Sequence, residues 1–155
     1  MKKTALLLVY VLLAASAAGQ APDFSGNWKL NTAKSKLGDQ FSMAPYSIII
    51  KQQGNDLSVE KHSTFQDQEF TTNDKFTLDG KECINAGFMD SQKKSTAVWS
   101  DDKTTLKITS KMPMGDGGEI TIIEIYKMDG SNMVIGSTAS SSFGDMSETM
   151  VYDRQ

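Results

Sequence analysis

The chain has 155 residues, and 39% of them are apolar, a share typical of one soluble domain. Sixteen Lys and Arg against 19 Asp and Glu give a formal net charge of −3, which excludes a basic nucleic-acid-binding protein. A single Cys excludes a framework of disulfides, and one Cys with one His excludes a zinc site built from these ligands.

The N-terminal segment predicts export. Met1-Lys2-Lys3 is a short positive region, residues 5–13 are apolar, and residues 14–19 are the small residues that a signal peptidase accepts. The apolar run is shorter than the roughly 20 residues of a membrane-spanning helix. We therefore expect a signal peptide over residues 1–19, cleaved after Ala18 or Gly19. The domain over residues 20–155 is then periplasmic or secreted, with no transmembrane segment.

Turn signals divide the rest of the chain into short β-rich segments. They recur about every 11 to 16 residues, as at Gly54-Asn55, Asp79-Gly80 and Asp129-Gly130, which is typical of a meander of strands. Short links force neighbouring strands to run antiparallel. The expected strands span residues 26–30, 46–51, 57–65, 69–78, 81–88, 95–100, 104–111, 119–127, 133–140 and 146–154.

One connection is long enough to hold something other than a tight turn. Asn31 can cap a short helical turn near residues 32–37, and Gly38 is a natural stop for it. The connection over residues 31–44 is either a lid over one end of the sheet or a surface loop.

Closure of the meander removes its two exposed edges, so we expect an all-β, antiparallel up-and-down β-barrel of about eight to ten strands. Apolar residues alternate along the strands, as do Leu57 and Val59, and this gives the sheet one apolar inner face. Several positions on that face are polar, namely Thr72, Asp74, Glu124 and Glu148. Such residues suit a barrel with a wet interior better than a small packed core.

The first strand resembles a known family. The segment Gly26-Asn27-Trp28 resembles the Gly-x-Trp start of lipocalin-like (calycin) barrels, and the pair Lys34-Ser35 extends the likeness to exported bacterial lipocalin-like domains. The resemblance implies a basic residue late in the last strand that packs across Trp28, and Arg154 is the only Arg in the chain. A ten-stranded barrel is similar to the fatty-acid-binding branch of that superfamily.

Three residues are therefore candidates for barrel closure. Gly26 allows a close approach of another chain segment, Trp28 fills one end of the barrel, and the Arg154 guanidinium stacks on the indole. Two other interpretations of Arg154 remain. It is solvated, or it forms a carboxylate site with Tyr152, as an Arg and a Tyr do in the opposite order in fatty-acid-binding barrels.

We find no arrangement of residues for catalysis. The sequence has no nucleophile elbow, no phosphate-binding Gly loop and no cluster of His, so we expect a protein that is not an enzyme and needs no cofactor or metal. Cys83 is expected as a buried small residue and His62 as a solvated one. The two Met at 112 and 114 are interpreted as flexible packing rather than as soft-metal ligands.

The function expected from these features is the binding of a small hydrophobic or amphipathic ligand inside a monomeric barrel. The alternative is a filled barrel that acts through its surface as an envelope or partner-binding module. The candidate ligand-binding residues are Thr72, Phe76, Trp99, Glu124, Tyr126 and Tyr152.

Overall fold

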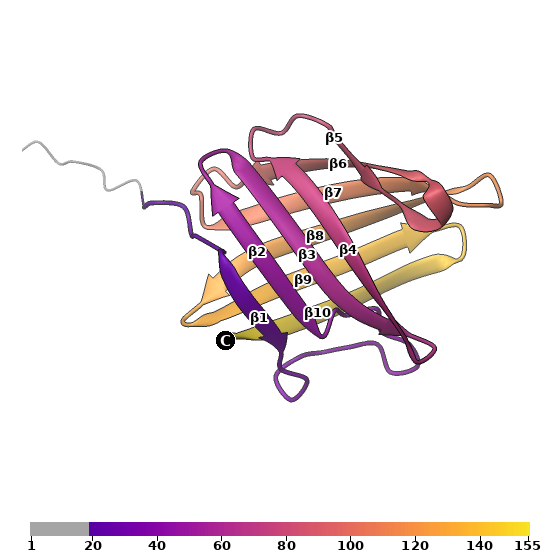
Figure 1. Ribbon diagram of the computed structural model, residues 1–155, viewed down its shortest axis with the longest axis horizontal. Helices are drawn as coiled ribbons and strands as arrows, with labels where there is room; N and C mark the ends of the chain where they lie inside the picture. The colour runs from indigo at the N-terminus through magenta and orange to yellow at the C-terminus, as the bar shows by residue number, and fades with distance from the viewer. Residues whose placement is uncertain (1–18) are drawn as a thin grey trace, which may run out of the picture.

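The computed structural model describes residues 19–155, so the predicted signal peptide lies almost wholly outside the described residues. Ten strands follow one another along these described residues (Figure 1). They are β1 (Gly26–Leu30), β2 (Ser47–Gln53), β3 (Asp56–Phe65), β4 (Gln68–Thr77), β5 (Cys83–Ala86), β6 (Gln92–Trp99), β7 (Thr105–Pro113), β8 (Glu119–Asp129), β9 (Asn132–Ser141) and β10 (Gly144–Arg154).

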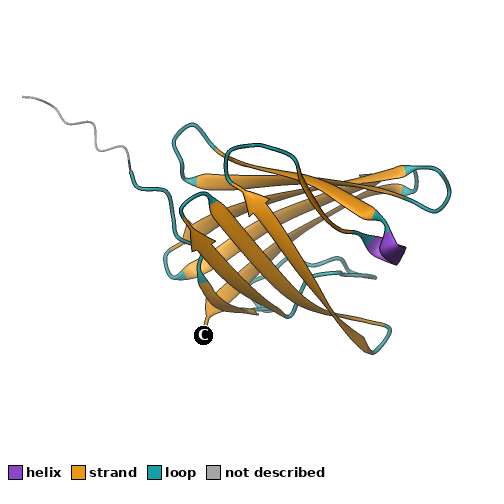
Figure 2. Ribbon diagram, turned by 45° about the horizontal axis from the view of Figure 1, so that its top comes forward, coloured by secondary structure: helices purple, strands orange, loops and turns teal. Residues whose placement is uncertain are grey.

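The strands form one antiparallel sheet in the order β4-β3-β2-β1-β10-β9-β8-β7-β6-β5. Strands that follow one another in sequence pair with each other, with the single exception of β4 and β5. The first strand pairs with the last, with Trp28 opposite Arg154, and this pairing closes the chain on itself. The prediction of an up-and-down barrel is confirmed, and Figure 2 shows the sheet curling until β4 and β5 come near each other.

Side chains join β4 to β5, where the described chain has no backbone ladder. The Asn85 side chain accepts a hydrogen bond from Lys75 N at 2.8 Å and donates one to Lys75 O at 3.0 Å. Thr77 N donates to the Cys83 sulfur at 3.3 Å. Cys83 is thus half-buried at this junction rather than fully buried as predicted, because its thiol faces the gap between the two strands.

The expected helical turn near residues 32–37 is present only as two successive turns. Lys34 N donates to Asn31 O and Ser35 N donates to Thr32 O, and the Asn31 side chain caps the first turn. No helix forms because Lys36 instead pairs as an isolated β-bridge with Thr149 of β10. The short 3-10 helix lies elsewhere, at Phe88–Asp90, between β5 and β6.

Alternation along the strands separates an inner face from an outer face. The buried cluster combines residues of alternate positions on nine strands and on the segment before β1. The outer face carries charged residues such as Lys107 and Lys127, which are exposed. His62 also lies on this face, where its imidazole bonds to the Glu60 carboxylate at 2.8 Å. In the described part of the chain, no helix has the length and apolar character of a membrane span.

Candidate functional site

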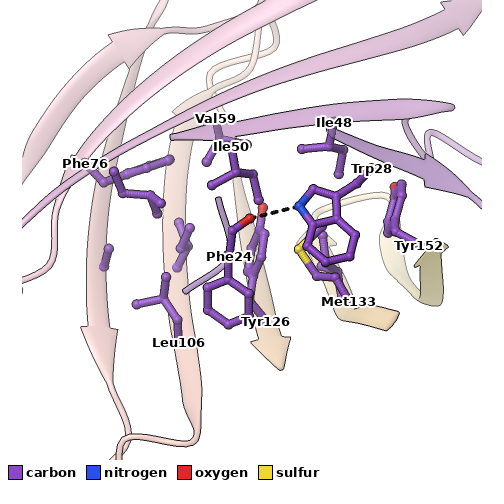
Figure 3. Packing of buried hydrophobic residues seen from close by; sticks show 14 of the residues in the cluster. Phe24, Trp28, Ile48, Ile50, Val59, Phe76, Leu106, Tyr126, Met133 and Tyr152 are labelled. Atoms are coloured by element: carbon purple, nitrogen blue, oxygen red, sulfur yellow. Dashed lines mark hydrogen bonds between the residues drawn. The ribbon is translucent and has the colours of Figure 1, made fainter. Parts of the chain in front are cut away.

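The inner face is packed most tightly at the end of the barrel where β1 begins, which we call the Trp28 end. Phe24, Trp28 and Tyr126 are all at most 1% exposed, and Trp28 Nε1 donates to Phe24 O at 2.9 Å (Figure 3). The Phe24 ring also stacks on Trp99 and meets Tyr126 edge-on, with centroids 5.9 Å apart in each pair. This end of the interior is therefore filled by aromatic side chains.

The three closure candidates lie together at the Trp28 end. The guanidinium carbon of Arg154 is 4.3 Å from the centre of the Trp28 ring, and Nη1 donates to Ser25 O at 2.7 Å. Gly26 has φ of +140°, and a Cβ there would lie 2.5 Å from Arg154 Nη1. The Arg154 side chain thus covers the end of the barrel only because Gly26 lacks a side chain.

A layer of charged residues crosses the middle of the barrel. Lys61 points inward from β3, and its Nζ lies 2.6 Å from Glu124 Oε1 on β8, on the opposite side of the interior. Both side chains are mostly buried. Burial has the largest single effect on the pKa of Lys61 and lowers it, but Glu124, Tyr126 and Asp74 together outweigh burial and hold the pKa above its usual range.

A second pair in this layer joins β4 to β6. Lys93 Nζ lies 2.7 Å from Asp74 Oδ2, and Asp74 is only 4% exposed. The other Asp74 oxygen, Oδ1, is buried without a hydrogen-bond partner within the described residues. β4 is one edge strand of the sheet, and β6 is next to the other edge strand, β5. The ion pair therefore links the two edges of the sheet inside the barrel, in addition to the hydrogen bonds that Asn85 makes between β5 and β4.

Two buried tyrosines flank the charged layer. The Tyr126 hydroxyl is buried and has no hydrogen-bond partner among residues 19–155, although the Lys61 ammonium lies near it. The Tyr152 hydroxyl donates to Pro45 O at 3.0 Å. Burial raises the pKa of both phenols, and the nearby Glu124 carboxylate adds to the effect at Tyr126. Both phenols are therefore neutral at physiological pH.

The opposite end of the barrel, which we call the Phe143 end, is apolar but open to solvent. Inner-face positions beyond the charged layer are half-buried or exposed: Phe70, Met112, Ile120, Ile122 and Met146. The connections and the end of β3 around them carry exposed apolar side chains, and we call these residues the rim: Phe41, Met43, Phe65, Phe88, Met89 and Phe143. Apolar surface thus continues from the rim down to the charged layer.

The long connection after β1 packs along this end. Gly38 N donates to Glu148 Oε1 at 2.8 Å, and the Phe41 ring meets Phe65 edge-on at 5.8 Å. Leu37 packs against the core cluster, whereas Phe41 and Met43 remain about half-exposed. The connection is therefore anchored at Glu148 and leaves its own apolar residues on the rim.

Two hollows on the outer surface are separate from this interior. One of about 670 Å³ is lined mainly by outward residues of β6 to β8, including Lys94 and Lys111. The other, of about 470 Å³, lies over β2 to β5. Neither lining includes Lys61 or Tyr126, so neither hollow reaches the charged layer.

The structure distributes the predicted ligand-binding residues over two regions. Phe76, Trp99 and Tyr152 belong to the packed core or its edge. Thr72, Glu124 and Tyr126 lie in or beside the charged layer, with Thr72 directly opposite Lys61 in the β3–β4 register. Within residues 19–155, no group of three or more His, Cys, Asp and Glu side chains is placed to hold a metal.

The sequence-based prediction missed the two inward lysines, Lys61 and Lys93. Lys61 follows Leu57 and Val59 at the spacing of two residues that marks the inner face, so alternation alone could have identified it. Lys93 shares its face with Ala97 in the same way. Their partners, Glu124 and Asp74, were recognised as inward residues, and the lysines explain how these acids are stabilised there.

Comparison with known proteins supports the fold. Neither a family model nor a curated protein matches the sequence. Among solved structures, the chain is similar to the zebrafish ileal bile acid-binding protein complexed with cholic acid, with a TM-score of 0.57 and 15% identity over 85% of this chain and 98% of that one. It is also similar to the apo form of Caenorhabditis elegans lipid binding protein 8, with a TM-score of 0.58 and 12% identity over 85% and 95%.

Both of these proteins are binding proteins by name, and neither name states a reaction. The likeness is thus to a bile acid-binding protein and a lipid binding protein rather than to lipocalins specifically. At this identity the comparison shows the fold alone: the chain is an all-β, antiparallel barrel that is similar in fold to these two proteins.

Proposed function

We propose that this chain is a non-catalytic protein that binds a small hydrophobic or amphipathic molecule inside its barrel. The observation that carries the proposal is the decrease in burial along the inner face, from the Trp28 end to the Phe143 end. Ile122 and Met146 face inward yet are only half-buried, whereas the residues of the Trp28 end are fully buried. Because apolar surface left in contact with water is costly, a ligand that covers it is stabilised by about 25 cal/mol per Å². The bile acid and lipid binding of the similar barrels agrees with this proposal.

The order of layers favours an amphipathic molecule. Its apolar part would lie against the residues between the rim and the charged layer, and its polar part would reach Glu124 and Tyr126. The exposed rim residues provide an apolar entrance at the Phe143 end.

Filling the interior tests this proposal. Ala139 faces inward opposite Ile122, and its neighbour Thr138 is exposed on the outer face. Ala139→Trp should abolish the fluorescence enhancement of Nile red, a neutral apolar dye, whereas Thr138→Trp should leave it unchanged. Equal dye binding by the two variants, or no dye binding by the parent chain, would contradict the proposal and favour a filled barrel that acts through its surface.

We also propose that the protein is exported, on the basis of the positive, apolar and small-residue regions of residues 1–19. Expression of the full chain in a bacterial host should yield a periplasmic product that begins at Gly19 or Gln20. A product that keeps Met1 and remains in the cytoplasm would contradict export.

A further inference from the structure

The barrel interior holds more acidic than basic side chains, and this excess bears on the charge of the ligand. Between the packed Trp28 end and the rim, the described inner face carries two cations, Lys61 and Lys93, and three carboxylates, those of Asp74, Glu124 and Glu148. Each lysine already holds a carboxylate at 2.6 or 2.7 Å. No described cation in this part of the interior is left to receive an anion.

Arg154 does not supply a free cation to the interior. Its guanidinium lies over Trp28 at the end of the barrel and donates to Ser25 O. The Tyr152 hydroxyl is likewise occupied by Pro45 O. The two residues are therefore engaged with the protein and do not form an Arg–Tyr carboxylate site.

Two buried polar atoms in the same layer have no partner in the described chain. They are Asp74 Oδ1 and the Tyr126 hydroxyl, on residues that are 4% and 1% exposed. An ionised carboxylate can only accept hydrogen bonds, so the group that satisfies Asp74 must donate one. A phenol can donate or accept. Leaving such buried atoms unpaired is unfavourable, and a ligand that pairs with them gains affinity.

We propose that the ligand has a polar group that donates hydrogen bonds and carries no negative charge, such as a hydroxyl or an amine, on an apolar body. This inference rests on the proposed ligand-binding function and specifies the polar group. A carboxylate at this depth would meet Asp74 and Glu124 with no free cation, and an unpaired buried charge is strongly disfavoured. A hydroxyl can donate a hydrogen bond to Asp74 Oδ1. A protonated amine can donate in the same way, and its positive charge also offsets the excess of carboxylates over lysines in the interior.

Displacement of Nile red from the full chain at neutral pH tests the inference with three molecules of equal chain length: dodecanol, dodecylamine and dodecanoate. We expect dodecanol, dodecylamine or both to displace the dye at a concentration at least about tenfold lower than dodecanoate does. Equal or stronger displacement by dodecanoate would overturn the inference. Bound Nile red that none of the three molecules displaces would also overturn the inference. If Nile red does not bind to the protein at all, the proposed function itself is refuted.

A single substitution locates the polar group. Tyr126→Phe removes the unpartnered hydroxyl and should weaken dodecanol or dodecylamine binding about fivefold, the loss expected for one hydrogen bond. Tyr46→Phe, at a tyrosine that is 41% exposed, is the matched control and should bind as the parent does. Unchanged affinity in Tyr126→Phe, with Nile red still bound, would show that the ligand does not reach this hydroxyl.

Discussion

Two buried tyrosine hydroxyls have opposite roles at the scale of single residues. The Tyr152 hydroxyl satisfies the buried carbonyl of Pro45, whereas the Tyr126 hydroxyl satisfies nothing in the described chain. Tyr152→Phe should therefore lower the free energy of unfolding by about 1 kcal/mol, and Tyr126→Phe should leave it unchanged or raise it. Urea unfolding of both variants in the absence of ligand measures this difference. Equal destabilisation would mean that the Tyr126 hydroxyl has a partner in the free protein.

The contact between Arg154 and Trp28 can be measured by a double-mutant cycle. Arg154→Met keeps most of the aliphatic side chain and removes the charge, and Trp28→Leu removes the aromatic face. We expect a coupling energy of about 0.5 to 1 kcal/mol from thermal or urea unfolding of the four proteins. If the two substitutions were strictly additive, the stacked geometry would contribute nothing to barrel closure.

At the scale of elements, Asn85 makes two of the hydrogen bonds that join β4 to β5, beside the one from Thr77 N to the Cys83 sulfur. Asn85 takes the place of a ladder by pairing with both the N–H and the C=O of Lys75. Asn85→Ala should cost about 1 to 3 kcal/mol and should speed amide hydrogen exchange at Lys75. Asn85→Asp keeps only the acceptor, so it should preserve protection of the Lys75 amide better than Asn85→Ala does. Unchanged exchange in Asn85→Ala would show that the gap is held closed by other contacts.

The strands could be predicted from the sequence because turn residues and alternation are local signals. The predicted strand over residues 69–78 differs from β4 by one residue at each end. The family resemblance implied a contact between Arg154 and Trp28, and the Arg154 guanidinium carbon lies 4.3 Å from the centre of the Trp28 ring. The predicted strand over residues 81–88 was too long, because the chain bends into the 3-10 helix at Phe88–Asp90. Met89 in that bend has φ of +52°, which no residue pattern there indicates.

The charged layer was only half predictable. The inward acids stood out because they interrupt apolar positions, but their partners come from distant strands. Lys61 and Glu124 are 63 residues apart in the chain and meet only because the sheet curls into a barrel. Which lysine neutralises which acid therefore depends on the tilt and curvature of the whole sheet, which local patterns do not encode.

At the scale of the whole molecule, we expect the folded protein to lose stability at alkaline pH because of the groups in its interior. The folded state raises the pKa of Lys61, Tyr126 and Tyr152 above their values in the unfolded chain. The folded state therefore favours the protonated forms of these groups, so the free energy of unfolding is unaffected by their titration below the unfolded values of about 10 and falls as the pH rises beyond them. Urea midpoints should be constant near neutral pH and fall steeply above about pH 10. A parent protein whose urea midpoint is unchanged at about pH 11 would contradict this account of the layer.

The central claim is that an amphipathic molecule lies inside the barrel with its polar group at the charged layer. Intermolecular nuclear Overhauser effects measure this directly in protein carrying ¹³C-labelled tyrosine and isoleucine, with dodecanol bound. The account predicts contacts from the ligand chain to Ile122 and from the ligand's polar end to the Tyr126 ring. Contacts confined to outward residues such as Ile123, with none to Tyr126, would contradict it.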